Sequence, residues 1–447
     1  MPGERSYERN PEFRDEAERL RRRKHNPFLD QGPPPDWPML DEVALQGLPG
    51  DVVRAIAPAS EADPVALLVQ YLVAAGNVIG RGPHYRVEGD QHGPNLFAVI
   101  VGDSSKSRKG TSWGRIRQIM EVADPEWMRA RRVGGMSSGE GLIAPVRDAV
   151  IGHAKDGKNW IESEITPGVA DKRLMVIEAE FSSALAVMKR EGNTLSSIIR
   201  EAWDRGDLAT MTKNSPLRAT GAHISIIGHI TTDELCAELD RVSMCNGFGN
   251  RFLWLMVRRS KTLPFGGVID DETIATLARR THEAIVVAQG VERVDLSTQA
   301  REMWRAVYPA LSASSPGLRG ALTARAEAQV IRLGLIYALL DERDQIAVEH
   351  LEAAIALWDY TDASVDFIFG DTLGDPTADA ILQKLREVGP TGCSRTEIRD
   401  LFVRHRTTEQ LNRALARLEA AGKAKKTERE TGGRPAKVWV AVVQDKQ

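Results

Sequence analysis

Hydrophobic positions in the middle of the chain follow two alternating patterns. Short apolar runs that predict buried strands occur at residues 95–101 (NLFAVIV), 173–181 (RLMVIEAEF), 222–231 (AHISIIGHIT) and 250–257 (NRFLWLMV). Segments with helical spacing of apolar residues separate them, as at 137–148 and 181–191. Continuous apolar strands interleaved with helices predict an α/β domain with a mainly parallel sheet.

The flanking segments have different patterns. Residues 1–40 are rich in Arg, Glu, Asn and Pro, which is typical of a charged arm or linker. Residues 296–375 carry long amphipathic stripes that predict helices, and they end in the turn-rich stretch GDTLGDPTA. We therefore expect four parts: an arm (1–40), an α/β core (41–295), a helical domain (296–375) and a C-terminal domain (376–447).

The C-terminal part predicts three helices followed by a β-hairpin around a Gly-Gly turn, which is the order of a winged helix. The second helix is opened by Ser394, which can cap it. Residues 376–447 carry a net charge of +6 and the remainder −9, giving the total of −3. This asymmetry favours a nucleic-acid contact, with protein binding as the alternative. The candidate DNA-binding residues are Arg413, Arg417, Lys425, Lys426, Arg434 and Lys437.

Composition excludes several classes of protein. The three cysteines form no Cys-x-x-Cys pair, so a disulfide framework or structural zinc is not expected. The N-terminus has no apolar signal core, and no apolar run reaches the roughly 20 residues that span a bilayer. We expect a cytoplasmic protein without membrane association.

The first predicted strand leads into VGDSSKSRKGTS (residues 101–112), which resembles a phosphate-binding loop. The usual pattern is Gly-x-x-x-x-Gly-Lys-[Ser/Thr]. Here Gly102 to Lys109 is one residue too long, and counting back from Lys109 places Asp103 and Arg108 at the glycine positions. The alternative is a basic surface loop with a Ser/Thr helix cap. The candidate phosphate contacts are Gly102, Ser107, Arg108, Lys109, Gly110, Thr111 and Ser112.

Polar residues after the other strands could complete such a site. Glu178 and Glu180 follow a strand and would point the same way in an extended segment, where they could hold Mg²⁺ and polarise water. Thr231 could sense a terminal phosphate or simply cap the next helix. Arg251, between a Gly-rich turn and a strand, could reach a neighbouring subunit's phosphate or form a structural salt bridge. Less specific candidates are His229, Thr232, Arg241, Arg325 and Arg332.

Taken together and in this order along the chain, these stretches resemble the P-loop ATPase domain of phage, prophage and plasmid primase-helicase proteins. The resemblance covers about residues 41–370 and includes NLFAVIVGDSSKSRKGTSW, VIEAEFSSAL, HITTDEL, NGFGNRFLWLMVRRS and RLGLIYALLD. It implies a RecA-like or AAA-like core. It also implies phosphate contacts at Lys109 and Thr111, Glu178 and Glu180 as metal and catalytic acids, and Arg251 as an inter-subunit finger. The loop departs from the family pattern by lacking the second glycine.

The expected function is an ATP-dependent, DNA-binding motor of a mobile element, most simply a replicative helicase or helicase-like ATPase. ATP and Mg²⁺ would be its cofactors, and Thr111 with Glu178 would hold the metal. DNA and further copies of the chain in a ring, such as a hexamer, would be its partners, and any primase would be a separate chain. The alternative is a non-catalytic or weakly catalytic nucleotide-binding regulator or assembly factor that binds DNA.

Overall fold

The computed structural model describes residues 37–103, 107–156, 159–210, 217–238, 246–315, 317–369, 376–402, 406–420, 422–429 and 436–442. Most of the predicted arm lies outside these ranges, as do Arg241 and Arg434.

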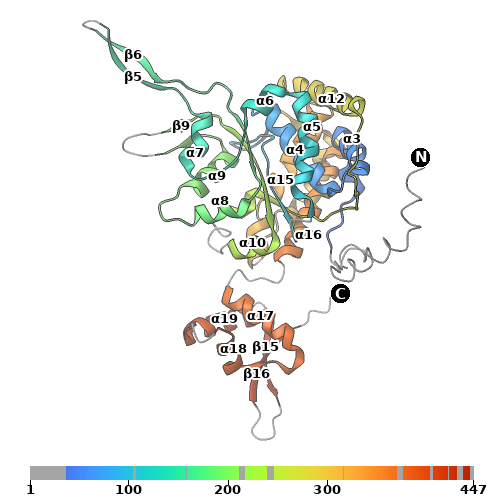
Figure 1. Ribbon diagram of the computed structural model, residues 1–447, viewed down its shortest axis with the longest axis vertical. Coiled ribbons are helices and arrows are strands. Elements are labelled where there is room, and N and C mark those ends of the chain that lie inside the picture. Colours follow the sequence, from blue (N-terminus) through green and yellow to red (C-terminus); the bar gives the residue numbers. More distant parts are fainter. Residues whose placement is uncertain are drawn as a thin grey trace, which may run out of the picture. The chain divides into compact units, whose positions relative to one another are not determined.

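A five-stranded parallel sheet forms the centre of the α/β part (Figure 1). Its strands are β3 (Phe97–Gly102), β4 (Arg132–Val133), β7 (Arg173–Glu178), β10 (His223–Thr231) and β11 (Phe252–Met256). They lie in the order β11-β3-β10-β7-β4, and every neighbouring pair is parallel. The predicted α/β class and parallel sheet are confirmed, while the two-residue strand β4 was not predicted.

The register fixes which strand ends lie together. Thr231 of β10 pairs with Gly102 of β3, so both strands end at the same level. Gly228 pairs with Val99 on one side and with Glu178 of β7 on the other. Glu178 therefore lies three residues below that level, about 10 Å along the strands at roughly 3.3 Å per residue.

Helix α4 (Pro64–Ile79) covers one face of the sheet and is almost entirely buried. It begins with the Asp63 cap and a proline in the first turn, and it ends at Gly80, whose φ is 89°. Three polar residues of β10 face this helix: His223 contacts the Gly76 carbonyl, Ser225 accepts from Asn77, and His229 contacts Gln70. The sheet residues on this side are thus anchored by hydrogen bonds as well as by apolar packing.

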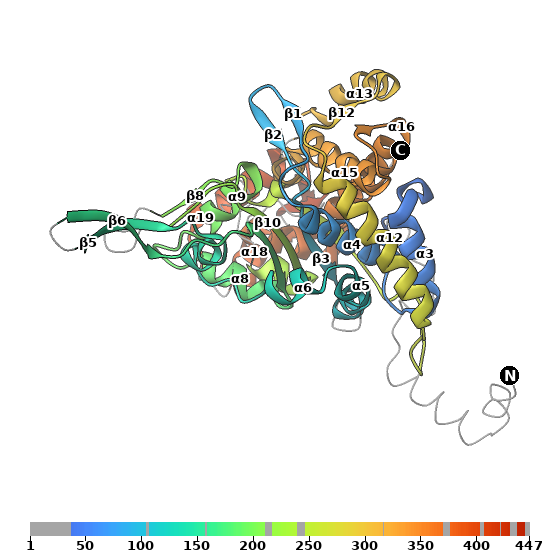
Figure 2. The ribbon, with the colours of Figure 1, turned by 90° about the horizontal axis from the view of Figure 1, so that it is seen from above.

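Further helices complete both layers, as Figure 2 shows. On the α4 side lie α3 (Gly47–Ile56), α5 (Lys109–Ala123) and α12 (Asp271–Gln289). On the other side lie α8 (Phe181–Met188) and α9 (Leu195–Asp204). A Cβ on Gly228 would come within 2.7 Å of the Phe181 ring, so this glycine permits the close approach of α8 to β10.

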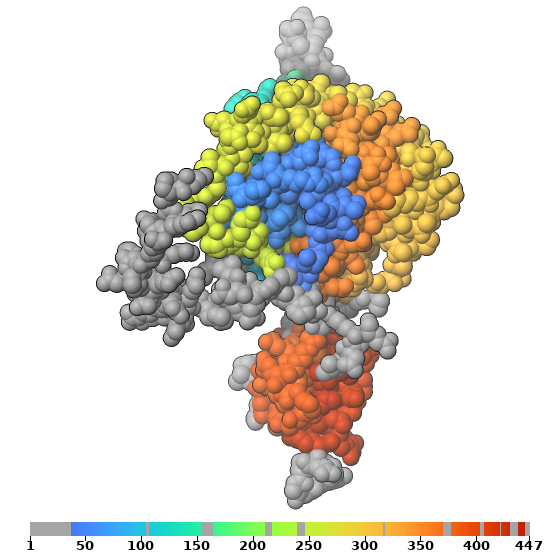
Figure 3. All heavy atoms as spheres, turned by 90° about the vertical axis from the view of Figure 1, so that its right-hand side faces the viewer, coloured from blue at the N-terminus to red at the C-terminus, as the bar shows by residue number. Residues whose placement is uncertain are grey.

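The predicted helical region contains α13 (Thr298–Leu311), α14 (Gly317–Thr323), α15 (Ala326–Leu340) and α16 (Val348–Phe369). Residues of α15 and α16 belong to the same hydrophobic cluster as those of α3, α4 and the sheet. Figure 3 shows part of this arrangement at the surface, where residues of α3 (blue) border those of α16 (orange). The helical region and the α/β part therefore share one core.

The C-terminal residues have a separate cluster of buried side chains, drawn from residues 378–439. It is formed by α17 (Pro376–Val388), α18 (Arg395–Leu401), α19 (Thr408–Ala420) and a small antiparallel sheet. The sheet has the order β14 (Cys393–Ser394), β16 (Ala436–Ala441), β15 (Ala424–Arg429). Ser394 and Glu397 form a capping box on α18, which confirms the predicted cap.

One projecting element was not predicted. The expected helix over 137–148 is shorter, as α7 (Gly139–Ile143) ends before Pro145, which cannot donate a helical hydrogen bond. The chain then forms a long antiparallel hairpin, β5 (Val150–Asp156) and β6 (Asn159–Thr166), which extends away from the sheet in Figures 1 and 2. None of the helices among the described residues combines the length and apolar character needed to cross a membrane.

Candidate functional site

The loop after β3 turns directly into α5. Arg108 has a φ of 59°, a left-handed conformation that favours glycine, and Lys109 is the first residue of the helix. A Cβ on Gly102 would lie 2.5 Å from the Ser107 hydroxyl, so the two ends of the loop approach closely. Gly102 is therefore required sterically. Position 108, in contrast, has a backbone conformation that favours glycine but is occupied by arginine.

The side chain of Lys109 reaches back to the start of this loop. It is only 9% exposed, and its Nζ donates to the Gly102 carbonyl over 3.3 Å. Burial lowers the pKa of its ammonium group, while the charges of Glu234 and Asp103 act in the opposite direction. The start of α5 adds backbone N–H groups to the lysine charge, which is the arrangement that attracts an anion.

A buried network holds the loop to α4 and β10. The Ser112 hydroxyl donates to the Lys109 carbonyl over 2.5 Å and accepts from Gln70 of α4. Gln70 also contacts His229 over 3.3 Å. Burial, with a smaller contribution from Lys109, lowers the pKa of His229 to about 4, so this histidine is neutral at pH 7. Neither Gln70 nor this role of Ser112 was predicted, because the partners are distant in sequence.

The hydroxyl residues after Lys109 are not placed as in the usual pattern. The Ser or Thr that contacts Mg²⁺ directly follows the lysine, and here Gly110 occupies that position. Thr111 is exposed one residue further, about 100° around the helix. No atom lies within 4 Å of a Cβ built on Gly110, so a side chain would fit there.

Arg108 points to a carboxylate of the same chain. Its Nε lies 2.6 Å from Glu61, and this carboxylate also binds Arg259 and accepts from the Leu263 backbone N–H over 2.7 Å. Burial alone would raise the pKa of Glu61, but the Arg259 hydrogen bond and its other partners lower it overall. Glu61 therefore stays charged and holds Arg108, which was expected to face phosphate.

Thr231 caps the helix that follows β10, α10 (Thr232–Glu238). Its backbone N–H and hydroxyl bind Glu234 over 3.1 and 2.8 Å, and its hydroxyl accepts from the Glu234 N–H. The capping alternative for Thr231 is thus the observed one. Beside it, the Thr232 hydroxyl lies 3.5 Å from Asp103. The charges of Asp103 and Glu234 act on Lys109, and neither acid was a site candidate from the sequence.

The two glutamates after β7 are arranged differently from each other. Glu178 is buried and accepts from the Met136 N–H over 2.6 Å, in the loop after β4. The strand ends at Glu178, and residues 179–180 form a turn in which exposed Glu180 precedes α8. The extended arrangement expected for the pair is therefore not observed. Among the hydrogen bonds of the described residues, none joins either glutamate to Lys109.

Arg251 lies near the amino-terminal ends of the strands, whereas the phosphate loop follows a carboxyl-terminal end. It directly precedes β11, whose first residue pairs with the first residue of β3. Its side chain is 8% exposed and binds Asp204 over 2.5 Å, and it also donates to the Gly247 carbonyl and to Asn250. Arg325 binds the other oxygen of Asp204 over 3.1 Å. The structural salt bridge considered for Arg251 is thus present in the single chain.

The candidate DNA-binding side chains of the C-terminal part differ in their surroundings. Arg413, Lys425 and Lys437 are exposed, and Arg417 is half-buried. Lys426 lies 3.3 Å from Glu419 and 4.7 Å from the centre of the Trp439 ring. Because Glu419 engages Lys426, which is exposed as well, Arg413, Lys425 and Lys437 are the better candidates for phosphate contacts.

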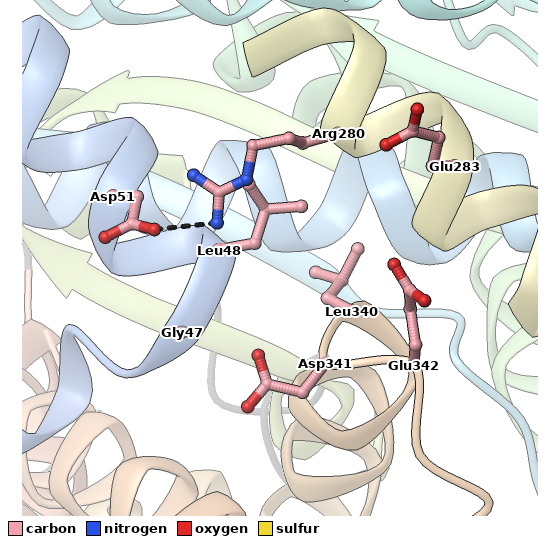
Figure 4. Close-up of a pocket in the computed structure, with 8 residues that line it drawn as sticks. All are labelled: Gly47, Leu48, Asp51, Arg280, Glu283, Leu340, Asp341 and Glu342. Atoms are coloured by element: carbon pink, nitrogen blue, oxygen red, sulfur yellow. Dashed lines mark hydrogen bonds and ion pairs between the residues drawn. The ribbon is translucent and has the colours of Figure 1, made fainter. Parts of the chain in front are cut away.

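A cavity of about 320 Å³ lies between α3, α12 and the end of α15 (Figure 4). Carboxylates of Asp51, Glu283, Asp341 and Glu342 line it. Arg280 is the only cation among the lining residues and is bound by Asp51 over 2.8 Å. None of the loop residues lines this cavity, and its acidic lining does not suit a phosphate.

Comparison with known proteins adds no assignment. The chain matches none of the models of known protein families, and no curated protein is found to be similar to it. Among the described residues there is also no group of three or more His, Cys, Asp or Glu side chains that could hold a metal ion.

Proposed function

We propose that the loop between β3 and α5 binds the phosphates of ATP, and that the protein is an ATP-dependent, DNA-binding motor. The observation that carries the proposal is the position of Lys109: the first residue of a helix, at the carboxyl end of a central parallel strand, beside the loop backbone. Ligands of open parallel sheets bind at this edge. The resemblance to the primase-helicase ATPase family supports the same assignment.

Individual residues would have distinct roles. Lys109 would neutralise the outer phosphates, and the N–H groups at the start of α5 would orient them. Mg²⁺ in such sites is held by one or two carboxylates together with phosphate oxygens, so a dedicated metal cluster is not needed. Asp103 or Glu178 would supply a carboxylate and Thr111 a hydroxyl, and the metal would offset the charge of the phosphates. Glu180 and Glu234 are the exposed acids that could orient water.

Assembly and DNA binding complete the proposal. A neighbouring copy would have to present Arg251 after release from Asp204, so hydrolysis would depend on ring formation. The C-terminal part, with the helix order and hairpin of a winged helix, would bind DNA through Arg413, Lys425 and Lys437. A replicative helicase or helicase-like ATPase would combine these properties.

ATP hydrolysis by the full chain, with and without single-stranded DNA, tests the motor. The test compares the wild type with Lys109→Ala and with Lys189→Ala, a partly exposed lysine that directly follows α8, at concentrations that allow oligomers. We expect DNA-stimulated hydrolysis in the wild type and the control and at least a 100-fold loss in Lys109→Ala. Absence of hydrolysis in the wild type under every condition would exclude the motor.

A second function, a regulator that binds nucleotide without hydrolysis, is favoured by two observations. Gly110 occupies the position of the metal-binding hydroxyl, and Arg108 is held by Glu61. Equilibrium binding of a nucleotide separates the two functions. Binding that needs Lys109 but is not followed by hydrolysis supports the regulator, and absence of binding excludes both.

A further inference from the structure

A second cavity, of about 370 Å³, lies at the opposite end of β3 from the phosphate loop. Strand β2 (Asp90–His92), α9 and α15 contribute its lining, which includes His92, Trp203, Arg325 and Arg332. Its size is within the range of small-molecule sites. Asn95, just before β3, binds Arg332, whereas Lys109 follows the strand. Strand β3, about 20 Å long, separates the cavity from the phosphate loop, so a ligand in one does not contact the other.

Arg332 is a buried cation without a carboxylate partner. It is 1% exposed, and its nitrogens donate to the carbonyl and side-chain oxygens of Asn95 and to the Trp203 carbonyl over 2.7–2.9 Å. Among the described residues no acid lies within ion-pair distance of it. A guanidinium has five N–H donors, and its Nε is buried without a partner. Burying a cation without a counter-charge is costly, so an anion is missing from this environment.

The surrounding donors are also incompletely used. The guanidinium groups of Arg332, Arg325 and Arg251 lie 3.7, 5.1 and 5.9 Å from the centre of the Trp203 ring, so three cations converge on one indole. Within the part of the chain that the structure describes, the indole Nε1 of Trp203 and the Nδ1 of His92 have no hydrogen-bond partner. Burial, with a smaller contribution from Arg332, lowers the pKa of His92 to about 4, which agrees with a positive local potential.

Two of the acids that line the cavity are paired with arginines that also line it, and the other two accept a backbone hydrogen bond or are open to water. Asp204 is shared by Arg251 and Arg325, Asp90 binds Arg205 over 3.2 Å, and Asp207 accepts from the Gly221 N–H over 3.0 Å. Glu201 is exposed. The unused hydrogen-bonding capacity of the cavity is therefore mostly on donors.

We propose that this cavity is a second anion site, which binds a phosphate dianion between Arg325 and Arg332. The guanidinium fork matches phosphate oxygens, and Arg325 would exchange its contact with Asp204, which Arg251 still binds, for the phosphate. The phosphate could be free or carried by a nucleotide. The site does not depend on the phosphate loop.

The test is a calorimetric titration of inorganic phosphate into the full chain carrying Lys109→Ala, which removes the loop's lysine. We expect one phosphate site per chain, and at least tenfold weaker binding when Arg325→Gln is added. Arg279→Gln, an exposed arginine of α12, is the control with the same loss of charge and leaves binding unchanged. Acetate at equal ionic strength binds more weakly than phosphate.

Two outcomes decide against the site. No binding to the Lys109→Ala chain, or equal binding with Arg325→Gln, overturns it. Arg325→Lys, which keeps the charge without the fork, gives intermediate affinity and guards against misfolding of the glutamine variant. Titration with ADP distinguishes a nucleotide phosphate from free phosphate. Loss of ATP binding at the loop in Lys109→Ala is measured separately, so failure of the proposed function would not be mistaken for failure of this site.

Discussion

At the scale of single residues, substitutions at Gly110 test whether the loop is a nucleotide site or an ordinary surface loop. The space around it admits a side chain, and a non-glycine residue favours the helix by up to about 1 kcal/mol. Gly110→Ser and Gly110→Ala should therefore both raise the melting temperature. Only Gly110→Ser restores the metal-binding hydroxyl, so it alone should strengthen Mg²⁺-dependent ATP binding. Equal ATP binding by the two variants would count against a metal-assisted phosphate site.

Two buried histidines make stability depend on pH. Burial lowers the pKa of His223 to about 3 and, with help from Lys109, that of His229 to about 4, below the unfolded value of about 6.5. The unfolded chain thus binds more protons between pH 6.5 and the folded-state pKa values of about 3 and 4, so stability is full above pH 6.5 and falls as pH decreases through this window. Between pH 7.0 and 4.5, each histidine should lower the free energy of unfolding by on the order of 2–3 kcal/mol.

Urea unfolding at pH 7.0 and 4.5 measures this loss. His229→Gln should reduce the difference in unfolding free energy between the two pH values, and His282→Gln on α12 serves as the control. An unchanged difference in His229→Gln would mean that this histidine is not buried neutral in the folded protein.

The sequence predicted the position of Lys109 but not its neighbours. A strand, a polar loop and a lysine before a helix are local features, and they can be read from adjacent residues. Glu61, Gln70 and Glu234 come close to the loop only through the packing of α4 and α10, which no local spacing encodes. The contact between Arg108 and Glu61 was not predicted for the same reason, because the two residues are distant in sequence.

At the scale of secondary-structure elements, Asn77 ties α4 to the sheet. Its amide nitrogen donates to the Leu174 and His223 carbonyls and the Ser225 hydroxyl over 3.0–3.2 Å, and its oxygen accepts from Trp127 over 2.9 Å. Asn77→Leu would leave several of these buried groups unpaired and should cost about 3 kcal/mol. Chemical denaturation measures the change, with exposed Gln118→Leu as a control expected to shift it by less than about 0.5 kcal/mol. A loss of similar size in both variants would contradict the anchoring role.

Elements differed in how well the sequence predicted them. The long apolar strands β3, β7, β10 and β11 are buried on both faces, and such runs are the clearest strand signal. Strand β4 has only two residues, and hairpin β5–β6 pairs with itself, so neither carries a continuous apolar run. The turn after Glu178 was likewise not visible, because an acid after an apolar run fits either an extended segment or a helix start.

At the scale of the whole molecule, charge is divided unevenly between two hydrophobic clusters. The C-terminal residues 376–447 carry +6 and have their own buried cluster, whereas the remainder carries −9. A basic part joined to an acidic one would direct a polyanion to the basic part alone. DNA binding, if it occurs there, should therefore be strongly salt-dependent and separable from phosphate binding at Lys109.

The double substitution Lys425→Glu and Lys437→Glu tests this separation in the full chain. Both side chains are exposed on the β15–β16 hairpin, so folding should be unaffected. Losing two phosphate contacts should weaken DNA binding at low salt and reduce the slope of log K against log salt by about 2. Fluorescence anisotropy with single- and double-stranded DNA, repeated at several salt concentrations, measures both changes.

The control is the double substitution Arg86→Glu and Arg129→Glu, at exposed arginines outside the C-terminal part. It changes the net charge equally and should leave the slope unaltered. If the two double variants behave alike, the hairpin is not the DNA contact, and the search moves to the α/β part.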